Sequence, residues 1–212
     1  LNLGDYLEDK LGSQGIYQLD EMIKFLDYDQ KRINILIRNG LNIPTGNKEK
    51  DAQKIIDFTQ SLIYDSADSI NIRTPFTTLF EGGGNCKDFS FLALTMMKCA
   101  KIDAVYVRVP PLKNAKDMDA HTLLGVAGKF KGFSVRYNKK DYYLAEATGQ
   151  DWSRRLARWK IGKIHGRDKL DWRKVTIYAP DWKLDIRPPN YLKQRYLSPS
   201  KVEYTRTRKN IE

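Results

Sequence analysis

The chain has 212 residues, of which 41% are hydrophobic and 30% charged, a composition typical of a globular domain with a sizeable core. It has no run of 18 apolar residues and no basic stretch leading into an apolar N-terminal segment, so we expect neither a transmembrane helix nor a signal peptide. Two cysteines are too few for a disulfide framework, which favours a reducing, cytoplasmic compartment.

The net charge of +11 is concentrated at the C-terminal end of the chain. Residues 151–212 hold 17 of the 37 Lys and Arg but 7 of the 26 Asp and Glu, which gives this part +10 and leaves +1 for residues 1–150. Tryptophans are interleaved with these cations, a pattern suited to single-stranded nucleic acid or another anionic surface. The alternative is a solvated basic face with its tryptophans packed inward.

The first part of the chain is predicted to be helical. Apolar residues recur at three-to-four spacing over residues 16–40 and again over residues 48–63, with a turn at residues 44–46 between them. Residues 65–84 are predicted to form a loop, because they contain a proline and end in three glycines.

A cysteine lies where this loop gives way to a strongly apolar segment. Residues 86–100 are apolar nearly all round, which predicts a buried helix that begins at Cys86. A helix N-terminus carries unpaired N–H groups and the positive end of the dipole, so it stabilises the nucleophilic thiolate. Cys86 is therefore the candidate nucleophile, whereas Cys99, late in the same helix, fits a structural role.

The part after this helix is predicted to be an antiparallel sheet. Residues 104–109, 121–127, 132–137 and 142–145 have strand patterns, with a hairpin turn at residues 138–140, and residues 175–178 form a further short strand. Residues 152–159 are a possible short helix, and the chain from residue 187 onward resembles an extended arm. Helices followed by strands indicate an α+β fold in which the buried helix packs on the sheet.

Three side chains far apart in sequence complete a possible catalytic unit. His121 begins one predicted strand and Glu146 ends another, so adjacent antiparallel strands would set them side by side. A nucleophilic thiol needs a base to take its proton, and the base needs an acceptor that fixes its tautomer. Cys86, His121 and Glu146 are the candidates for these three roles.

The same residues resemble the motifs of the transglutaminase-like superfamily of cysteine enzymes, which have a papain-like fold. The resemblance covers about residues 50–150 and lies in three segments in the family's order, Gly84-Asn85-Cys86-Lys87-Asp88, Asp119-Ala120-His121-Thr122 and Glu146-Ala147-Thr148. It implies a catalytic core at residues 48–150, preceded by a helical segment at residues 1–47 and followed by a basic extension at residues 151–212. Glu146 replaces the family's usual aspartate, and Ala147 replaces its proline.

The resemblance also implies a reaction. Cys86 would attack the carbonyl of a peptide or protein amide, His121 would transfer the proton, and Glu146 would orient His121. The backbone N–H of Cys86 would bind the oxyanion, with Gln60 or Tyr64 as the candidate side-chain donor. Water as acceptor makes such an enzyme a peptidase or deamidase, and an amine makes it a transglutaminase.

One other interpretation competes with this one. A non-catalytic module on the same fold would use the basic C-terminal third to bind nucleic acid or an assembly partner. A zinc site is not expected, because the cysteines and histidines lack the spacing of metal ligands, and no cofactor is expected either.

Overall fold

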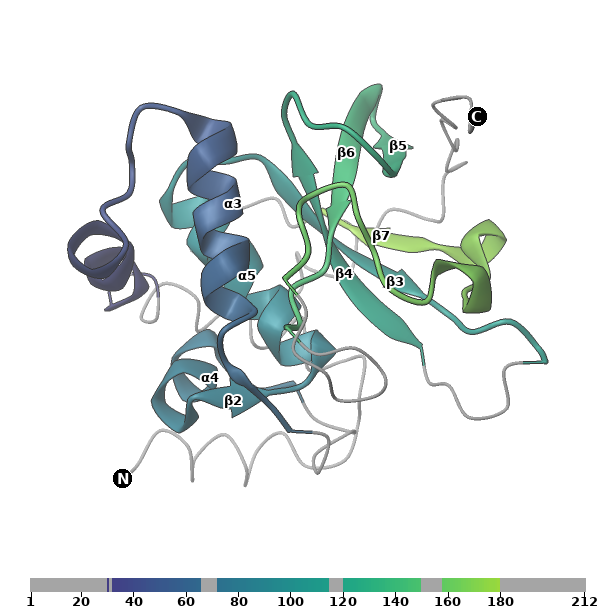
Figure 1. Cartoon of the computed structure of the whole chain (residues 1–212), viewed down its shortest axis with the longest axis horizontal. Helices are drawn as coiled ribbons and strands as arrows, with labels where there is room; N and C mark the ends of the chain where they lie inside the picture. The colour runs from purple at the N-terminus through teal and green to yellow at the C-terminus, as the bar shows by residue number, and fades with distance from the viewer. Residues whose placement is uncertain (1–29, 31, 66–71, 115–119, 150–157, 180–212) are drawn as a thin grey trace, which may run out of the picture.

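A computed structural model of the chain describes residues 30, 32–65, 72–114, 120–149 and 158–179. Within these ranges, helices pack against one face of a five-stranded antiparallel sheet (Figure 1). The fold is α+β, as the order of the sequence patterns predicts. The boundaries at residues 47 and 150 stay predictions.

The helical part begins with residues 32–35 and a π-helical turn, Leu36–Gly40, which belong to the helix predicted over residues 16–40. Most of that predicted helix lies outside the described residues. Helix α3, Lys48–Thr59, begins at its cap Asn47, whose side chain accepts a hydrogen bond from the backbone of Lys50. The helix ends four residues earlier than the pattern predicts, because the chain turns at Gln60.

The prediction of a loop over residues 65–84 is wrong for its second half. Helix α4, Pro75–Glu81, has Thr74 as its cap and ends at Gly82 in the left-handed conformation, with φ of 67°. Strand β2, Gly83–Gly84, then pairs in parallel with strand β1, Ile63–Tyr64. This pairing lays the end of the predicted second helix beside the glycines that precede Cys86.

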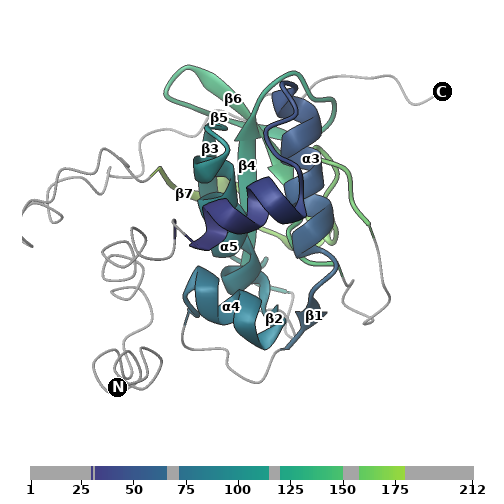
Figure 2. The ribbon, with the colours of Figure 1, turned by 90° about the vertical axis from the view of Figure 1, so that its left-hand side faces the viewer.

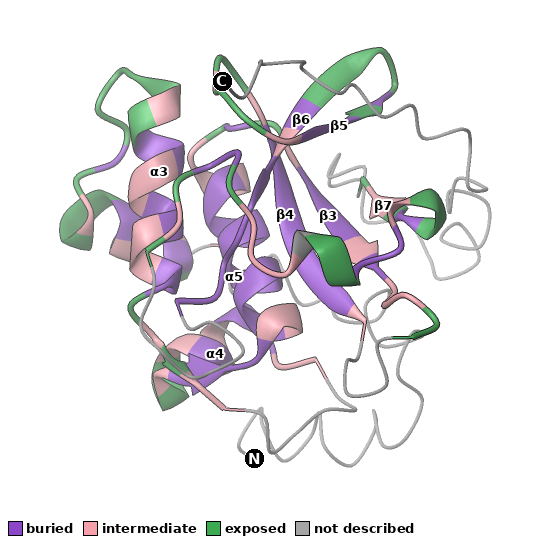
Figure 3. Cartoon of the chain, turned by 45° about the vertical axis from the view of Figure 1, so that its right-hand side comes forward, coloured by how far each residue is buried: buried purple, intermediate pink, exposed green. Residues whose placement is uncertain are grey.

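Helix α5, Cys86–Cys99, is the centre of the molecule, as its apolar sequence predicts. Every residue from 88 to 97 is buried, because α5 packs on strands β3 and β4 with one side and on α3 and α4 with the other (Figures 2 and 3). The N-terminal end of the helix, which carries Cys86, is less deeply buried.

The sheet has the order β5-β6-β4-β3-β7, and all of its neighbours are antiparallel. Asn138 and Lys139 both have positive φ, as a tight hairpin turn between β5 and β6 requires. The strands are β3 (Ala104–Val109), β4 (His121–Ala127), β5 (Ser134–Tyr137), β6 (Lys140–Ala145) and β7 (Thr176–Tyr178). Strand β7 shows that the segment predicted as an extension contributes to the sheet.

Each face of the sheet has its own hydrophobic core. One core lies between the sheet and the helices, and the other is covered by the segment that precedes β7. Trp172 of that segment packs edge-on against Phe133, with ring centroids 4.8 Å apart, so it packs inward as the alternative interpretation holds.

The possible helix at residues 152–159 and the arm from residue 187 fall on undescribed residues, except for residues 158 and 159. In the described part of the chain, no helix has the length and apolar character to cross a membrane.

Candidate active site

Cys86 occupies the first position of α5, and a capping box closes the turn that holds it. The Asn85 side chain accepts a hydrogen bond from the N–H of Lys87 at 2.9 Å, and the Asp88 carboxylate accepts one from the N–H of Asn85 at 2.9 Å. These bonds fix the first turn of the helix, so the thiol is held at the positive end of the helix dipole.

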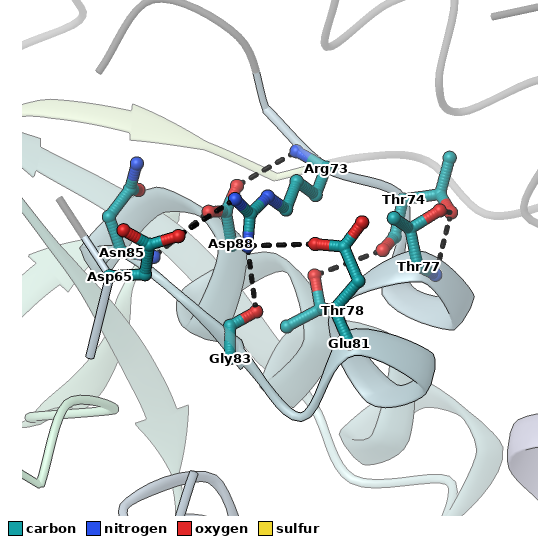
Figure 4. A network of polar contacts seen from close by, with 9 residues as sticks. All are labelled: Asp65, Arg73, Thr74, Thr77, Thr78, Glu81, Gly83, Asn85 and Asp88. Carbon is teal, nitrogen blue, oxygen red and sulfur yellow. Dashed lines mark hydrogen bonds and ion pairs between the residues drawn. The ribbon is translucent and has the colours of Figure 1, made fainter. Parts of the chain in front are cut away.

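The buried Asp88 also ties this turn to the loop before α4. Its second oxygen accepts a hydrogen bond from the backbone N–H of Arg73 at 2.8 Å, and burial raises the pKa of Asp88 to about 6. The Arg73 guanidinium in turn binds Asp65 at 3.1 Å and Glu81 at 2.9 Å (Figure 4). The network thus braces the chain on both sides of Cys86.

His121 and Glu146 lie together, although 25 residues separate them in sequence. The Nε2 atom of His121 lies 2.8 Å from Oε2 and 3.1 Å from Oε1 of Glu146, and both side chains are buried. Strands β4 and β6 pair with Leu124 opposite Ala145, which brings the start of one strand close to the end of the other. The predicted neighbourhood of these two residues is therefore present.

Further contacts hold Glu146 in place. The hydroxyl of Thr148 donates a hydrogen bond to Oε1 of Glu146 at 2.6 Å. The side-chain amide of Gln60 donates one to the main-chain carbonyl of Glu146 at 2.7 Å. Burial alone would raise the pKa of Glu146, but the charge and hydrogen bond of His121 and the hydrogen bonds of Thr148 lower it. Glu146 is thus ionised in its buried position.

The pKa of the Cys86 thiol depends on the neighbouring His121. Burial raises the pKa of Cys86, but the hydrogen bond and charge of His121 and the backbone N–H of Thr122 outweigh it, so the pKa is lowered. Burial would lower the pKa of His121, yet the opposing charge of Glu146 and the bonds to Cys86 and Glu146 raise it to about 10. Both shifts favour a thiolate paired with an imidazolium.

The arrangement of these elements is the one that the sequence analysis expects. A helix that begins with the cysteine packs on an antiparallel sheet whose strands present the histidine and the acid, in the order that the motifs predict. Nε2 is the ring nitrogen of His121 that faces Glu146.

Comparison with solved structures finds similarities of low score. A proposed cysteine protease from Cytophaga hutchinsonii is 16% identical over 71% of this chain, with a TM-score of 0.43, and a proposed protease from Parabacteroides distasonis is 18% identical over 62%, with a TM-score of 0.42. The chain spans 47% and 26% of those two proteins. LapG of Legionella pneumophila is 11% identical, with 68% of this chain and 81% of LapG covered and a TM-score of 0.41. No family model and no curated protein matches the sequence. Similarity of this size does not assign an activity.

The two candidates for the side-chain oxyanion donor differ in their surroundings. Gln60 is buried, and its amide nitrogen donates to the carbonyls of Glu146 and Trp159 at 2.7 and 3.0 Å. Tyr64 is half-buried in β1, opposite Gly84 and hence near the start of α5. Gln60 therefore supports the acid, whereas Tyr64 lies along the glycine strand that leads to Cys86.

Three residues of the site carry no assigned role in the sequence analysis. Thr148 bonds the Glu146 carboxylate, the backbone N–H of Thr122 helps to lower the pKa of Cys86, and Ser90 of α5 donates to the Thr122 carbonyl at 3.2 Å. Both threonines stand inside the quoted motifs, with Thr122 directly after the predicted base and Thr148 two residues after the predicted acid. Ser90, one turn after Cys86, gives no such signal, because serine is common in helices without a function.

Cys99 has surroundings unlike those of Cys86, and the described residues form no metal site. Cys99 lies 3.7 Å from the carbonyl of Gln30, and burial raises the pKa of its thiol to about 11. Among the described residues, no group of three or more His, Cys, Asp or Glu side chains is placed to hold a metal ion.

Proposed function

We propose that the chain is a cysteine-dependent amide-bond enzyme that acts on peptide or protein substrates through Cys86, His121 and Glu146. The observation that carries the proposal is the buried contact between His121 and Glu146, with 2.8 Å between Nε2 and Oε2, and the lowered pKa of the Cys86 thiol at the start of α5 supports it. A structural cysteine needs neither a basic partner nor a helix terminus.

The reaction begins with the thiolate of Cys86 attacking the carbonyl carbon of the amide. Charge moves to the carbonyl oxygen, which the backbone N–H of Cys86 stabilises, with Tyr64 as the candidate second donor. The His121 imidazolium then donates its proton to the leaving nitrogen, the C–N bond breaks, and a thioester to Cys86 remains. Glu146 keeps the imidazole oriented throughout and stabilises its charged form.

The second half of the reaction releases the acyl group. Neutral His121 takes a proton from the acceptor, which attacks the thioester, and the sulfur leaves as the thiolate. Water as acceptor yields a peptidase or deamidase, and an amine yields a transglutaminase. The choice is a property of access to the thioester rather than of the three catalytic residues.

The test uses the wild-type protein with a denatured protein substrate and three readouts. New amino termini report a peptidase, ammonia without chain cleavage reports a deamidase, and incorporation of a fluorescent primary amine reports a transglutaminase. Cys86→Ala should abolish whichever activity is found, and Cys99→Ala should retain it. Full activity in Cys86→Ala would contradict the proposal.

A further inference from the structure

Two glutamines of the α3 region hold a segment that comes a hundred residues later in the chain. The side-chain oxygen of Gln60 accepts a hydrogen bond from the N–H of Trp159 at 3.0 Å, and its nitrogen donates to the Trp159 carbonyl at 3.0 Å. The side-chain oxygen of Gln53, two turns earlier, accepts from the N–H of Ile161 at 3.0 Å. Residues 159–161 are thus bound by side-chain amides in the way that a neighbouring strand would bind them.

Gln60 differs from Gln53 in one contact. Its amide nitrogen also donates to the main-chain carbonyl of Glu146 at 2.7 Å, which is the shortest of its hydrogen bonds. A side-chain amide has two hydrogens, so both are used on main-chain carbonyls. Gln53 has no such bond, since its nitrogen donates to Asp57 at 2.8 Å and to the Trp159 carbonyl at 3.4 Å.

Close packing makes this support of Glu146 rigid. Gly149 lies so near to Gln60 that a Cβ built on it would come within 1.7 Å of the main-chain oxygen of Gln60. Gln60 itself is 3% exposed, so water does not compete for its bonds. Glu146 and Gly149 both contact Gln60, so the segment between them is held against the end of α3.

We propose that Gln60 is a positioning residue, which holds the main chain of Glu146 so that its carboxylate meets His121. This inference rests on the proposed function. It extends the site to Trp159, which Gln60 also bonds and which lies in the part of the chain predicted as a basic extension. The amide acts on the acid of the triad and not on the substrate's oxyanion.

Matched variants separate this role from a structural one. Gln60→Met and Gln53→Met keep the side-chain volume and each removes bonds to residues 159–161, but only the first releases Glu146. The readout is the pH dependence of Cys86 alkylation by iodoacetamide, which needs no knowledge of the substrate. Thermal unfolding by circular dichroism checks that both variants fold.

When Gln60 no longer holds Glu146, the carboxylate stabilises the imidazolium of His121 less well. The pKa of Cys86 then rises, because the charge of His121 lowers it in the wild type. For a rise of one unit, the midpoint of the Cys86 labelling profile moves one pH unit upward in Gln60→Met, which is a tenfold change in the acid dissociation constant of the thiol, and Gln53→Met keeps the wild-type profile. If Gln60→Met does not fold, Gln60→Asn, which keeps the amide but withdraws it by one methylene, should shift the profile in the same direction.

Two results would overturn the inference, and they are distinguishable. Equal profiles in the wild type and the folded Gln60 variants would reject the positioning role alone. Slow labelling of Cys86 already in the wild-type protein would reject the proposed function, and the inference with it.

Discussion

Glu146 faces the imidazole of His121 with both oxygens of its carboxylate, at 2.8 and 3.1 Å from Nε2. The longer side chain that replaces the family's usual aspartate therefore reaches the histidine, and Thr148 occupies one of the same oxygens. A buried carboxylate with these partners is a matched acceptor for an imidazolium, because each charge compensates the desolvation of the other. The departure from the family motif does not separate the acid from the base.

Shortening or neutralising this acid should impair catalysis by different amounts. Glu146→Asp withdraws the carboxylate by one methylene, and Glu146→Gln keeps the length but removes the charge that raises the pKa of His121. We expect kcat/KM to fall by about 10⁴-fold in Glu146→Gln, the scale seen when a triad acid becomes an amide, and less in Glu146→Asp. Equal kcat/KM values in Glu146→Gln and the wild type would remove Glu146 from the mechanism.

The two cysteines should differ strongly in their reaction with iodoacetamide. The pKa of Cys86 is lowered by His121 and by the N–H of Thr122, although burial opposes this, and burial raises the pKa of Cys99 to about 11. Because the thiolate is the reactive form, Cys86 should be labelled at lower pH than an ordinary cysteine, and Cys99 only at higher pH. Mass spectrometry of the two cysteine peptides across pH 5–9 measures this, and comparable rates at both sites would contradict an activated thiol.

The pair of His121 and Glu146 should shape the pH dependence of stability. The pKa of His121 is raised from 6.5 to about 10, so its contribution is fully present below pH 6.5 and is lost as pH rises through 10. The pKa of Glu146 is lowered, so its contribution is present above pH 4.5 and is lost as pH falls through the folded value. The free energy of unfolding in guanidinium chloride, measured from pH 3 to 10, should therefore fall at both ends.

A variant without the imidazole is the control for the loss of unfolding free energy at high pH. His121→Gln does not titrate in this range, so the stability difference between wild type and variant should shrink as pH rises from 6.5 towards 10. A difference that stays constant over this interval would show that His121 does not gain a charged partner on folding.

Gly84 should be intolerant of a side chain. A Cβ at this position would lie 2.8 Å from the Cβ of Asp88 and 2.9 Å from its Oδ2, so the capping box at the start of α5 would be forced open. We expect Gly84→Ala to cost about 1–3 kcal/mol of unfolding free energy, as overpacking of a tight site does, and to slow the labelling of Cys86. Gly40→Ala, an exposed position where the new Cβ meets the end of the Leu36 side chain at 3.2 Å, is the matched control. Similar losses in the two variants would argue against a special role for Gly84.

Several features of this protein follow from its sequence because they are local. The glycines before Cys86 and the apolar residues after it act within a few positions of one another, and they suffice to predict a buried helix with a thiol at its start. The alternation of β3 and the turn at Asn138 are local in the same sense. The order of Cys86, His121 and Glu146 could also be recognised in the sequence, because a motif is recognised without knowing how far apart its residues lie in space.

Other features depended on pairings that no local pattern encodes. The register of β4 against β6 decides whether Glu146 meets His121, and it is set by burial of both faces of the sheet. The hydrogen bonds of Gln60 join the end of α3 to Glu146 and Trp159, which come 86 and 99 residues later, so the sequence alone offered Gln60 only as a candidate oxyanion donor. Hydrogen-bond partners of a buried amide are chosen by whichever backbone groups the packed chain leaves beside it, and only the tertiary structure determines which those are.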